Sequence, residues 1–81
     1  MKLYYIWQNE NSGYDTFSDA VVAALSPAKA RMTHPSQLTQ WDGNDSWSGS
    51  WCKAKDVEVE FIGNAKRGTK AGVICASFHA G

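Results

Sequence analysis

The sequence predicts a small α+β domain, with an antiparallel sheet of about four strands and one short helix packed on it, in the order strand, strand, helix, loop, strand, strand. Residues 56–62 (DVEVEFI) alternate polar and apolar side chains, which is typical of a strand with one buried face. Ser26 and Pro27 indicate a helix start, because the serine hydroxyl accepts a hydrogen bond from a first-turn N–H group and proline there sacrifices none. With 81 residues the chain is expected to form a single domain, 1–81, with a thin core, as a monomer of marginal stability or a homo-oligomer.

The N-terminal half is expected to form a β-hairpin that leads into this helix. Residues 2–8 (KLYYIWQ) are rich in aromatic and β-branched side chains, and residues 9–13 (NENSG) then supply turn residues. The chain returns through residues 14–25, of which the run 20–25 (AVVAAL) is expected to be buried. The helix is expected to end near His34, after about two turns, because the following proline disfavours helical geometry.

The second half is predicted to contain a long loop and the last two strands. Residues 36–50 are dominated by Gly, Asn, Asp and Ser with tryptophans among them, which indicates a loop or an irregular hairpin. The strand at 56–62 follows, and residues 63–72 (GNAKRGTKAG) connect it to a final strand at 73–78 (VICASF). The sequence shows no internal repeat and no second domain.

Composition narrows the classes of function. Eight basic and eight acidic residues give a net charge of zero, which disfavours general binding to nucleic acid or to an anionic membrane. No apolar run approaches the roughly 20 residues that span a bilayer. The first residues do not resemble a secretory signal, so we expect a reducing compartment in which Cys52 and Cys75 are free thiols that pack as small core hydrophobes.

Catalysis and metal binding are both disfavoured by the positions of the reactive side chains. His34 lies before a proline and His79 near the end of the sequence, and neither stands in a recognised nucleophile motif. Together with Cys52 and Cys75, these histidines include no close pair of the kind that structural zinc sites use. We therefore expect a protein that is not an enzyme, with no catalytic residue, no metal site and no cofactor.

The tryptophans of the middle segment are the main candidates for a binding surface. An indole ring is costly to leave in water, yet tryptophan also dominates protein interfaces and stacks on bases, so core and contact roles both stay open. Acidic residues between the rings would add hydrogen-bonding character. The first hairpin offers a similar aromatic and polar loop, for which an ordinary turn is the alternative interpretation. The candidate contact residues are Tyr14, Asp15, Thr16, Trp41, Asp42, Asp45, Trp47 and Trp51.

The connection at 63–72 resembles a phosphate-binding loop only in part. Such a loop requires Gly-Lys-Ser/Thr before a helix, whereas here Thr69 precedes Lys70 and a strand follows. A solvated turn in which glycine supplies a positive φ is the simpler interpretation. Contact with a phosphate or an acidic partner is the alternative, and its candidate residues are Arg31, Lys66, Arg67 and Lys70.

Several segments together resemble a family of small bacteriophage proteins. They are 14–16 (YDT), 21–24 (VVAA), 34–36 (HPS), the tryptophan-bearing middle segment, 57–63 (VEVEFIG) and 72–81 (GVICASFHAG), so the likeness runs along nearly the whole chain. By analogy with small phage proteins of this fold style, the resemblance implies a protein of the host cytoplasm that acts by stoichiometric binding.

The functional expectation is then a non-enzymatic phage protein that antagonises a bacterial defence system by docking on a defence protein, as anti-CRISPR proteins do. One alternative is a sponge that sequesters a cyclic or ADP-ribose-type immune signalling nucleotide. A further alternative is a structural or replication accessory protein of the phage.

Overall fold

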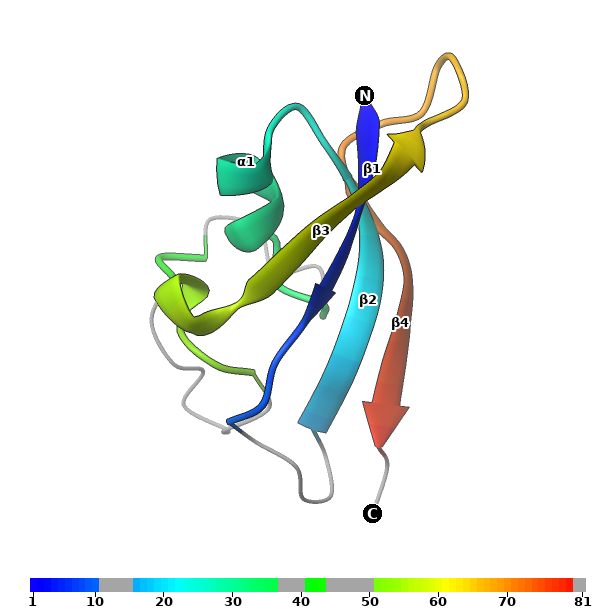
Figure 1. Cartoon of the computed structure of the whole chain (residues 1–81). Helices are drawn as coiled ribbons and strands as arrows, with labels where there is room; N and C mark the ends of the chain where they lie inside the picture. The colour runs from blue at the N-terminus through cyan, green and yellow to red at the C-terminus, as the bar shows by residue number, and fades with distance from the viewer. Residues whose placement is uncertain (11–15, 37–40, 44–50, 80–81) are drawn as a thin grey trace.

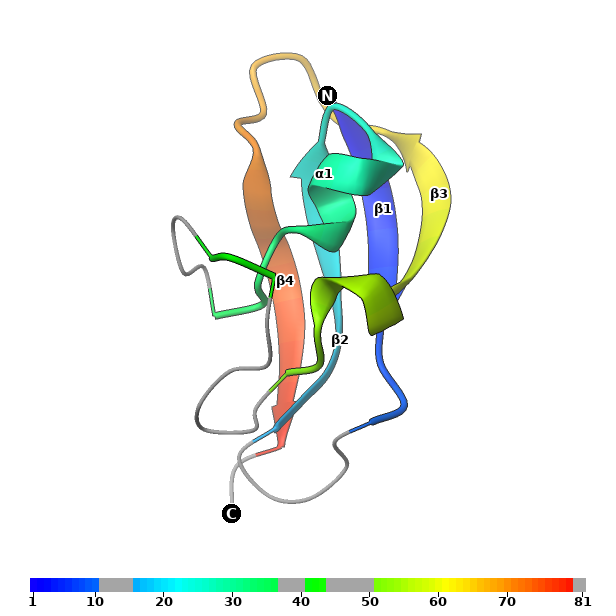
Figure 2. The same cartoon turned by 90° about the vertical axis from the view of Figure 1, so that its left-hand side faces the viewer.

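The computed structural model describes residues 1–10, 16–36, 41–43 and 51–79. They form a four-stranded antiparallel sheet in the order β3-β1-β2-β4 with one short helix packed on it, which confirms the predicted fold class. The elements in chain order are β1 (Lys2–Trp7), β2 (Thr16–Ala24), α1 (Pro27–Arg31), the 3-10 helix η1 (Ala54–Asp56), β3 (Glu58–Asn64) and β4 (Gly72–His79). Both α1 and η1 lie on the same side of the sheet (Figures 1 and 2).

The first hairpin forms the centre of the sheet, and the last two strands are added at its two edges. β1 and β2 pair along their length, from Lys2 with Ala24 to Trp7 with Asp19. β3 pairs with the outer side of β1, and β4 pairs with the outer side of β2. Although β3 and β4 follow one another in sequence, they are not paired with each other in the sheet. Residues 65–71 therefore cross from one edge of the sheet to the other (Figure 1).

The helix begins where the sequence predicts. The backbone N–H of Lys29 donates to the Ser26 hydroxyl at 3.2 Å, and Pro27 occupies the first turn. The helix is only five residues long and ends at Arg31, earlier than the predicted end near His34. The reason is that the N–H of Met32 donates to the carbonyl of Lys29 at 3.2 Å, a tight turn that closes the helix before the proline is reached.

The strand β3 begins two residues later than the alternating pattern predicts. Asp56 belongs to η1, where its N–H donates to the carbonyl of Lys53 at 2.9 Å. The N–H of Val57 then donates to the carbonyl of Ala54 at 3.2 Å, which completes the turn. β3 also continues to Asn64, two residues beyond the predicted end.

The core lies between the sheet and the layer that contains α1 and η1. The buried cluster comprises Tyr4, Ile6, Ala20, Val22, Ala24, Ala30, Trp51, Cys52 and Val57. The short helix contributes only Ala30 to it, so the 0% exposed ring of Trp51 supplies much of the volume that a longer helix would provide. None of the helices in the described residues has the length and apolar composition that a membrane crossing requires.

The two cysteines have different environments. Both are free thiols; Cys52 is buried in the core, whereas Cys75 is exposed on β4. The prediction that both pack as core hydrophobes is therefore wrong for Cys75. The cause is its place on an edge strand, in the row of residues that faces away from the helix.

Candidate binding surface

The side of the sheet opposite α1 includes two neighbouring rows of side chains that cross all four strands. Residues paired across antiparallel strands project to the same face of a sheet. In the order β3, β1, β2, β4, the rows are Glu60, Tyr5, Val21 and Cys75, and Glu58, Trp7, Asp19 and Ser77. None of these eight side chains is buried, and no described element lies over them in Figures 1 and 2. These eight residues are referred to below as the open face.

An aromatic pair forms the middle of the open face. The rings of Tyr5 and Trp7, two residues apart on β1, stack with 5.1 Å between their centroids and 25° between their planes. The hydroxyl of Tyr5 donates a 2.7 Å hydrogen bond to the carboxylate of Asp19 on β2, which holds the tyrosine ring in this position. This hydrogen bond raises the pKa of Tyr5, with smaller contributions from burial and from the negative charges of Asp19 and Glu60.

The open face is acidic. Asp19, Glu58 and Glu60 contribute three carboxylates, and none of the eight residues is a lysine or an arginine. Flat aromatic rings beside carboxylates form a good environment for a guanidinium group, which can stack on a ring and donate to carboxylate oxygens. The same carboxylates repel phosphate groups. The surface therefore suits a cationic partner better than a nucleic acid.

His34 is the centre of an aromatic cluster on the covered side. Its ring meets Phe17, Trp41 and Trp51 edge to face at centroid distances of 6.3, 5.2 and 6.5 Å. Its Nδ1 accepts from the backbone N–H of Ser36 at 3.1 Å, so the ring proton resides on Nε2, which has no hydrogen-bond partner among the described residues. Burial lowers the pKa of His34. The ring is thus a neutral part of the core.

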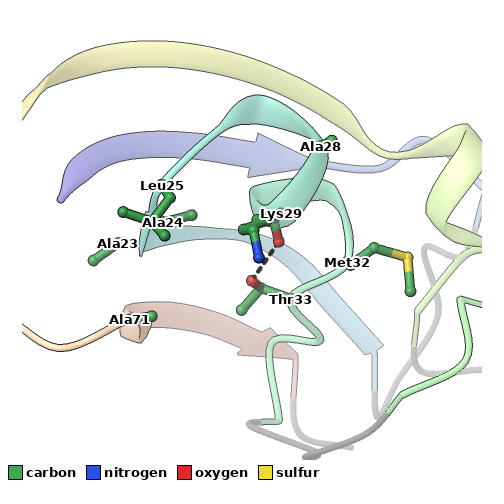
Figure 3. Close-up of a pocket in the computed structure, with 8 residues that line it drawn as sticks. All are labelled: Ala23, Ala24, Leu25, Ala28, Lys29, Met32, Thr33 and Ala71. Carbon is green, nitrogen blue, oxygen red and sulfur yellow. Dashed lines mark hydrogen bonds between the residues drawn. The ribbon is translucent and has the colours of Figure 1, made fainter.

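A cleft of about 580 Å³ lies between α1 and the start of β4 (Figure 3). Its lining residues are Ala23, Ala24, Leu25, Ala28, Lys29, Met32, Thr33 and Ala71. The side chains are mostly apolar, and Lys29 carries the only charge among them. Among the described residues, no histidine, cysteine or carboxylate lines the cleft, so the walls that they form offer apolar contact and no pair of groups for acid–base or nucleophilic chemistry.

The structure separates the predicted contact residues of the tryptophan segment. Trp51 is completely buried and takes the core role that the sequence had left open, and Thr16 is only 7% exposed, so neither side chain forms part of the accessible surface. Trp41 is half-buried and packs on His34, and Asp42 is exposed. The remaining candidates lie outside the described residues; they are Tyr14, Asp15, Asp45 and Trp47.

The predicted cationic residues do not form one site within a protomer. Lys66, Arg67 and Lys70 are exposed in the connection between β3 and β4, where Thr69 caps the turn by donating from its hydroxyl to the carbonyl of Lys66 at 2.6 Å. Positive φ at Gly68 (91°) and Gly72 (139°) confirms the predicted turn. Arg31 donates instead to the carbonyl of Val57, at the other end of β3. A seven-residue strand spans roughly 20 Å, too far for one phosphate to join both groups.

The central residues of the open face were not among the sequence-based candidates. The alternation in 56–62 does place Glu58 and Glu60 on one face, which is the signal that could have located this surface. Tyr5, Trp7 and Asp19 lie in segments that a strand pattern alone assigns to neither face. They are accessible because the two described helices, α1 and η1, both pack on the other side of the sheet.

No group of three or more His, Cys, Asp or Glu side chains that could hold a metal ion occurs in the part of the chain that the structure describes. Comparisons with family models, with curated proteins and with solved structures found no match to the chain. The open face is accordingly the feature on which a functional argument rests.

Proposed function

We propose that the protein is a non-enzymatic phage protein that antagonises a bacterial defence system by docking through its open face on a lysine- and arginine-rich surface of a defence protein. The observation that carries the proposal is the stacked Tyr5–Trp7 pair, which is half-buried and lies among three carboxylates on the open face. Tyrosine and tryptophan are enriched among the residues that dominate binding energy at protein interfaces.

The charge of the open face favours a particular kind of target. Proteins that act on nucleic acid carry basic surfaces for its phosphates. An acidic face complements such a surface and competes with nucleic acid for it. The resemblance of the sequence to small phage proteins supports a host defence protein as the bearer of that surface.

The size of the open face also constrains the contact. Strand spacing of about 4.8 Å and a rise of about 3.3 Å per residue give two rows of four side chains a surface of roughly 13 by 19 Å. That area accommodates one helix of about 10–12 Å diameter, or one flat basic patch. Since stable interfaces bury about 800 Å² per partner, the contact would extend to exposed residues around the sheet.

Charge reversal on β3 tests the docking surface. The double variant Glu58→Lys with Glu60→Lys replaces two exposed acidic side chains, and Glu10→Lys is the matched control at an exposed position outside the open face. Each protein is expressed in hosts that carry one of a panel of defence systems, and phage plating is measured. We expect wild type and the control to restore plating on at least one host, and the double variant to lose at least tenfold of that effect.

Binding to the defence protein identified in this way is then measured with purified proteins at two salt concentrations. Wild-type affinity should fall as salt rises, because opposite charges form the contact. If the double variant keeps its circular dichroism spectrum and still binds with the affinity of wild type, the open face is not the docking surface. If wild type restores phage plating on no host of the panel, the proposed role against defence systems is ruled out.

A second candidate function is sequestration of a cyclic or ADP-ribose-type signalling nucleotide. The observation that favours it is the exposed group of Lys66, Arg67 and Lys70 in one turn. A rise in melting temperature with such nucleotides, lost in Lys66→Glu with Arg67→Glu and retained in Lys53→Glu, would support this function. Co-purification with phage particles without any effect on plating would instead favour an accessory phage protein.

A further inference from the structure

We propose that two copies of the chain pair through the free edge of β4, antiparallel, to form one continuous eight-stranded sheet. Among the described residues, the strand order leaves two edges unpaired, β3 on one side and β4 on the other. Each edge presents backbone N–H and C=O groups that another strand can bind. The two edges differ in how well their sequences protect them against such pairing.

β3 carries the features by which natural edge strands avoid pairing. Its sequence includes the charged residues Glu58 and Glu60, and its register with β1 shifts between Leu3 and Tyr4, which marks a bulge. Pairing two copies of β3 would bring like charges together. β3 is therefore a poor surface for self-association.

β4 has fewer of these features. Its eight residues, GVICASFH, include no aspartate, glutamate, lysine, arginine or proline. The register with β2 shifts between Phe17 and Asp19, where the extra residue, Ser18, belongs to β2, and between Val21 and Val22, where β4 itself bulges at Ile74. The part from Cys75 to His79 follows this bulge. Pairing is accordingly assigned to this second part of the strand.

The side chains of β4 also favour a second copy as the occupant. Phe78, in the part assigned to pairing, is 46% exposed, although it already packs on Phe17 at 4.7 Å between ring centroids. A second β4 would reduce the exposure of this ring and, unlike a pair of β3 strands, would bring no like charges together. Antiparallel self-pairing also closes after two copies, whereas pairing β4 with β3 of another copy would continue into a filament.

The two-fold axis of such a pair has a geometric consequence. It stands perpendicular to the sheet, so the open faces of both copies lie on the same side of the eight-stranded sheet. At the axis, one residue of β4 therefore lies directly opposite the same residue of the second copy. Residues opposite one another across antiparallel strands have Cα atoms about 4.5–5.5 Å apart, within the range that a disulfide bridges.

Cysteine cross-linking tests the pairing independently of the docking function. Cys75 can form a disulfide with its own copy if the two-fold axis passes at position 75. Ala76→Cys and Ser77→Cys, each combined with Cys75→Ser, test whether the axis passes at position 76 or 77. Under mild oxidation at least one of the three proteins should form a covalent dimer in high yield. Glu60→Cys with Cys75→Ser is the control on the other edge and should form no covalent dimer.

Sedimentation of the unmodified chain under reducing conditions gives the second measurement. Wild type should reach twice the 8.9 kDa chain mass as concentration rises. Ser77→Lys, which places two lysines near one another at the β4 edge, should raise the dissociation constant at least tenfold, whereas Asn9→Lys in an exposed loop should not. A wild-type monomer at all concentrations without cross-linking at any of the three positions would overturn the proposal. Cross-linking of Cys75 to Glu60→Cys in a mixed sample would overturn it as well, since β4 would then pair with β3.

Discussion

The hydroxyl of Tyr5 donates a 2.7 Å hydrogen bond to the carboxylate of Asp19 across β1 and β2 in the middle of the open face. We predict that Asp19→Asn lowers the pKa of Tyr5 towards its usual value, because the charged acceptor that raises it is removed. The ultraviolet absorbance of wild type and of Asp19→Asn is titrated with pH, each with and without Tyr5→Phe. Subtracting the curve with Tyr5→Phe from the curve without it gives the titration of Tyr5 alone, free of the other two tyrosines. An unchanged curve would mean that the hydrogen bond does not persist in solution.

This raised pKa also links stability to alkaline pH. Because the fold favours the neutral phenol, the contribution is fully present below the pKa of the unfolded chain, near 10, and is lost as pH rises through the folded pKa. Tyr5→Phe should therefore be less stable than wild type at pH 8, by about 0.5 kcal/mol for the loss of this partly buried hydrogen bond. The difference should shrink at pH 11, as measured by urea unfolding.

Acid should destabilise the fold through His34. Burial lowers the pKa of this ring, and its neighbours Phe17, Trp41 and Trp51 carry no charge that would stabilise a proton. Stability is thus fully present above the unfolded pKa, near 6.5, and falls as pH decreases through the folded pKa. The melting temperature of wild type should fall between pH 7.5 and pH 5.

His34→Phe should reduce this pH dependence, since it keeps an aromatic ring and removes the titrating group. Its hydrogen bonds with Ser36 are lost at all pH values, so the comparison concerns the slope with pH and not the absolute stability. An identical slope in wild type and variant would show that another group controls acid unfolding.

Truncation of two tryptophans should destabilise the fold to very different extents. Trp51→Ala removes the largest buried side chain and should destabilise the fold by about 3–5 kcal/mol, enough to unfold a domain of this size. Trp7→Ala removes a half-exposed ring from the open face and should cost about 1 kcal/mol while it weakens partner binding. Circular dichroism during urea unfolding measures both, because it does not depend on indole fluorescence. Equal losses at the two positions would contradict the division into core and surface.

The contrast between these rings shows what the sequence could and could not predict. Ser26, Pro27 and the alternation in 56–62 are local signals, and the helix start and β3 follow from them closely. The burial of Trp51 was not predictable from a Gly- and Ser-rich context, because its partners come from distant strands. The separation of β3 and β4 to opposite edges, and the open face that results, likewise depend on long-range pairing that no local pattern encodes.

Gly43 should tolerate substitution less well than Gly68, although both have positive φ, of 84° and 91°. A Cβ atom at position 43 would lie 3.2 Å from the Cβ of Ala54 and 3.2 Å from the Sδ of Met32, whereas at position 68 it would meet nothing within 4 Å. The carbonyl of Gly43 also accepts from the N–H of Ala54 at 2.7 Å, so the loop cannot move away without losing that bond. We expect Gly68→Ala to cost about 1 kcal/mol from backbone conformation alone, and Gly43→Ala to cost about 2 kcal/mol or more. Urea unfolding of both variants decides between them, and equal costs would mean that the segment around Gly43 moves to relieve the contact.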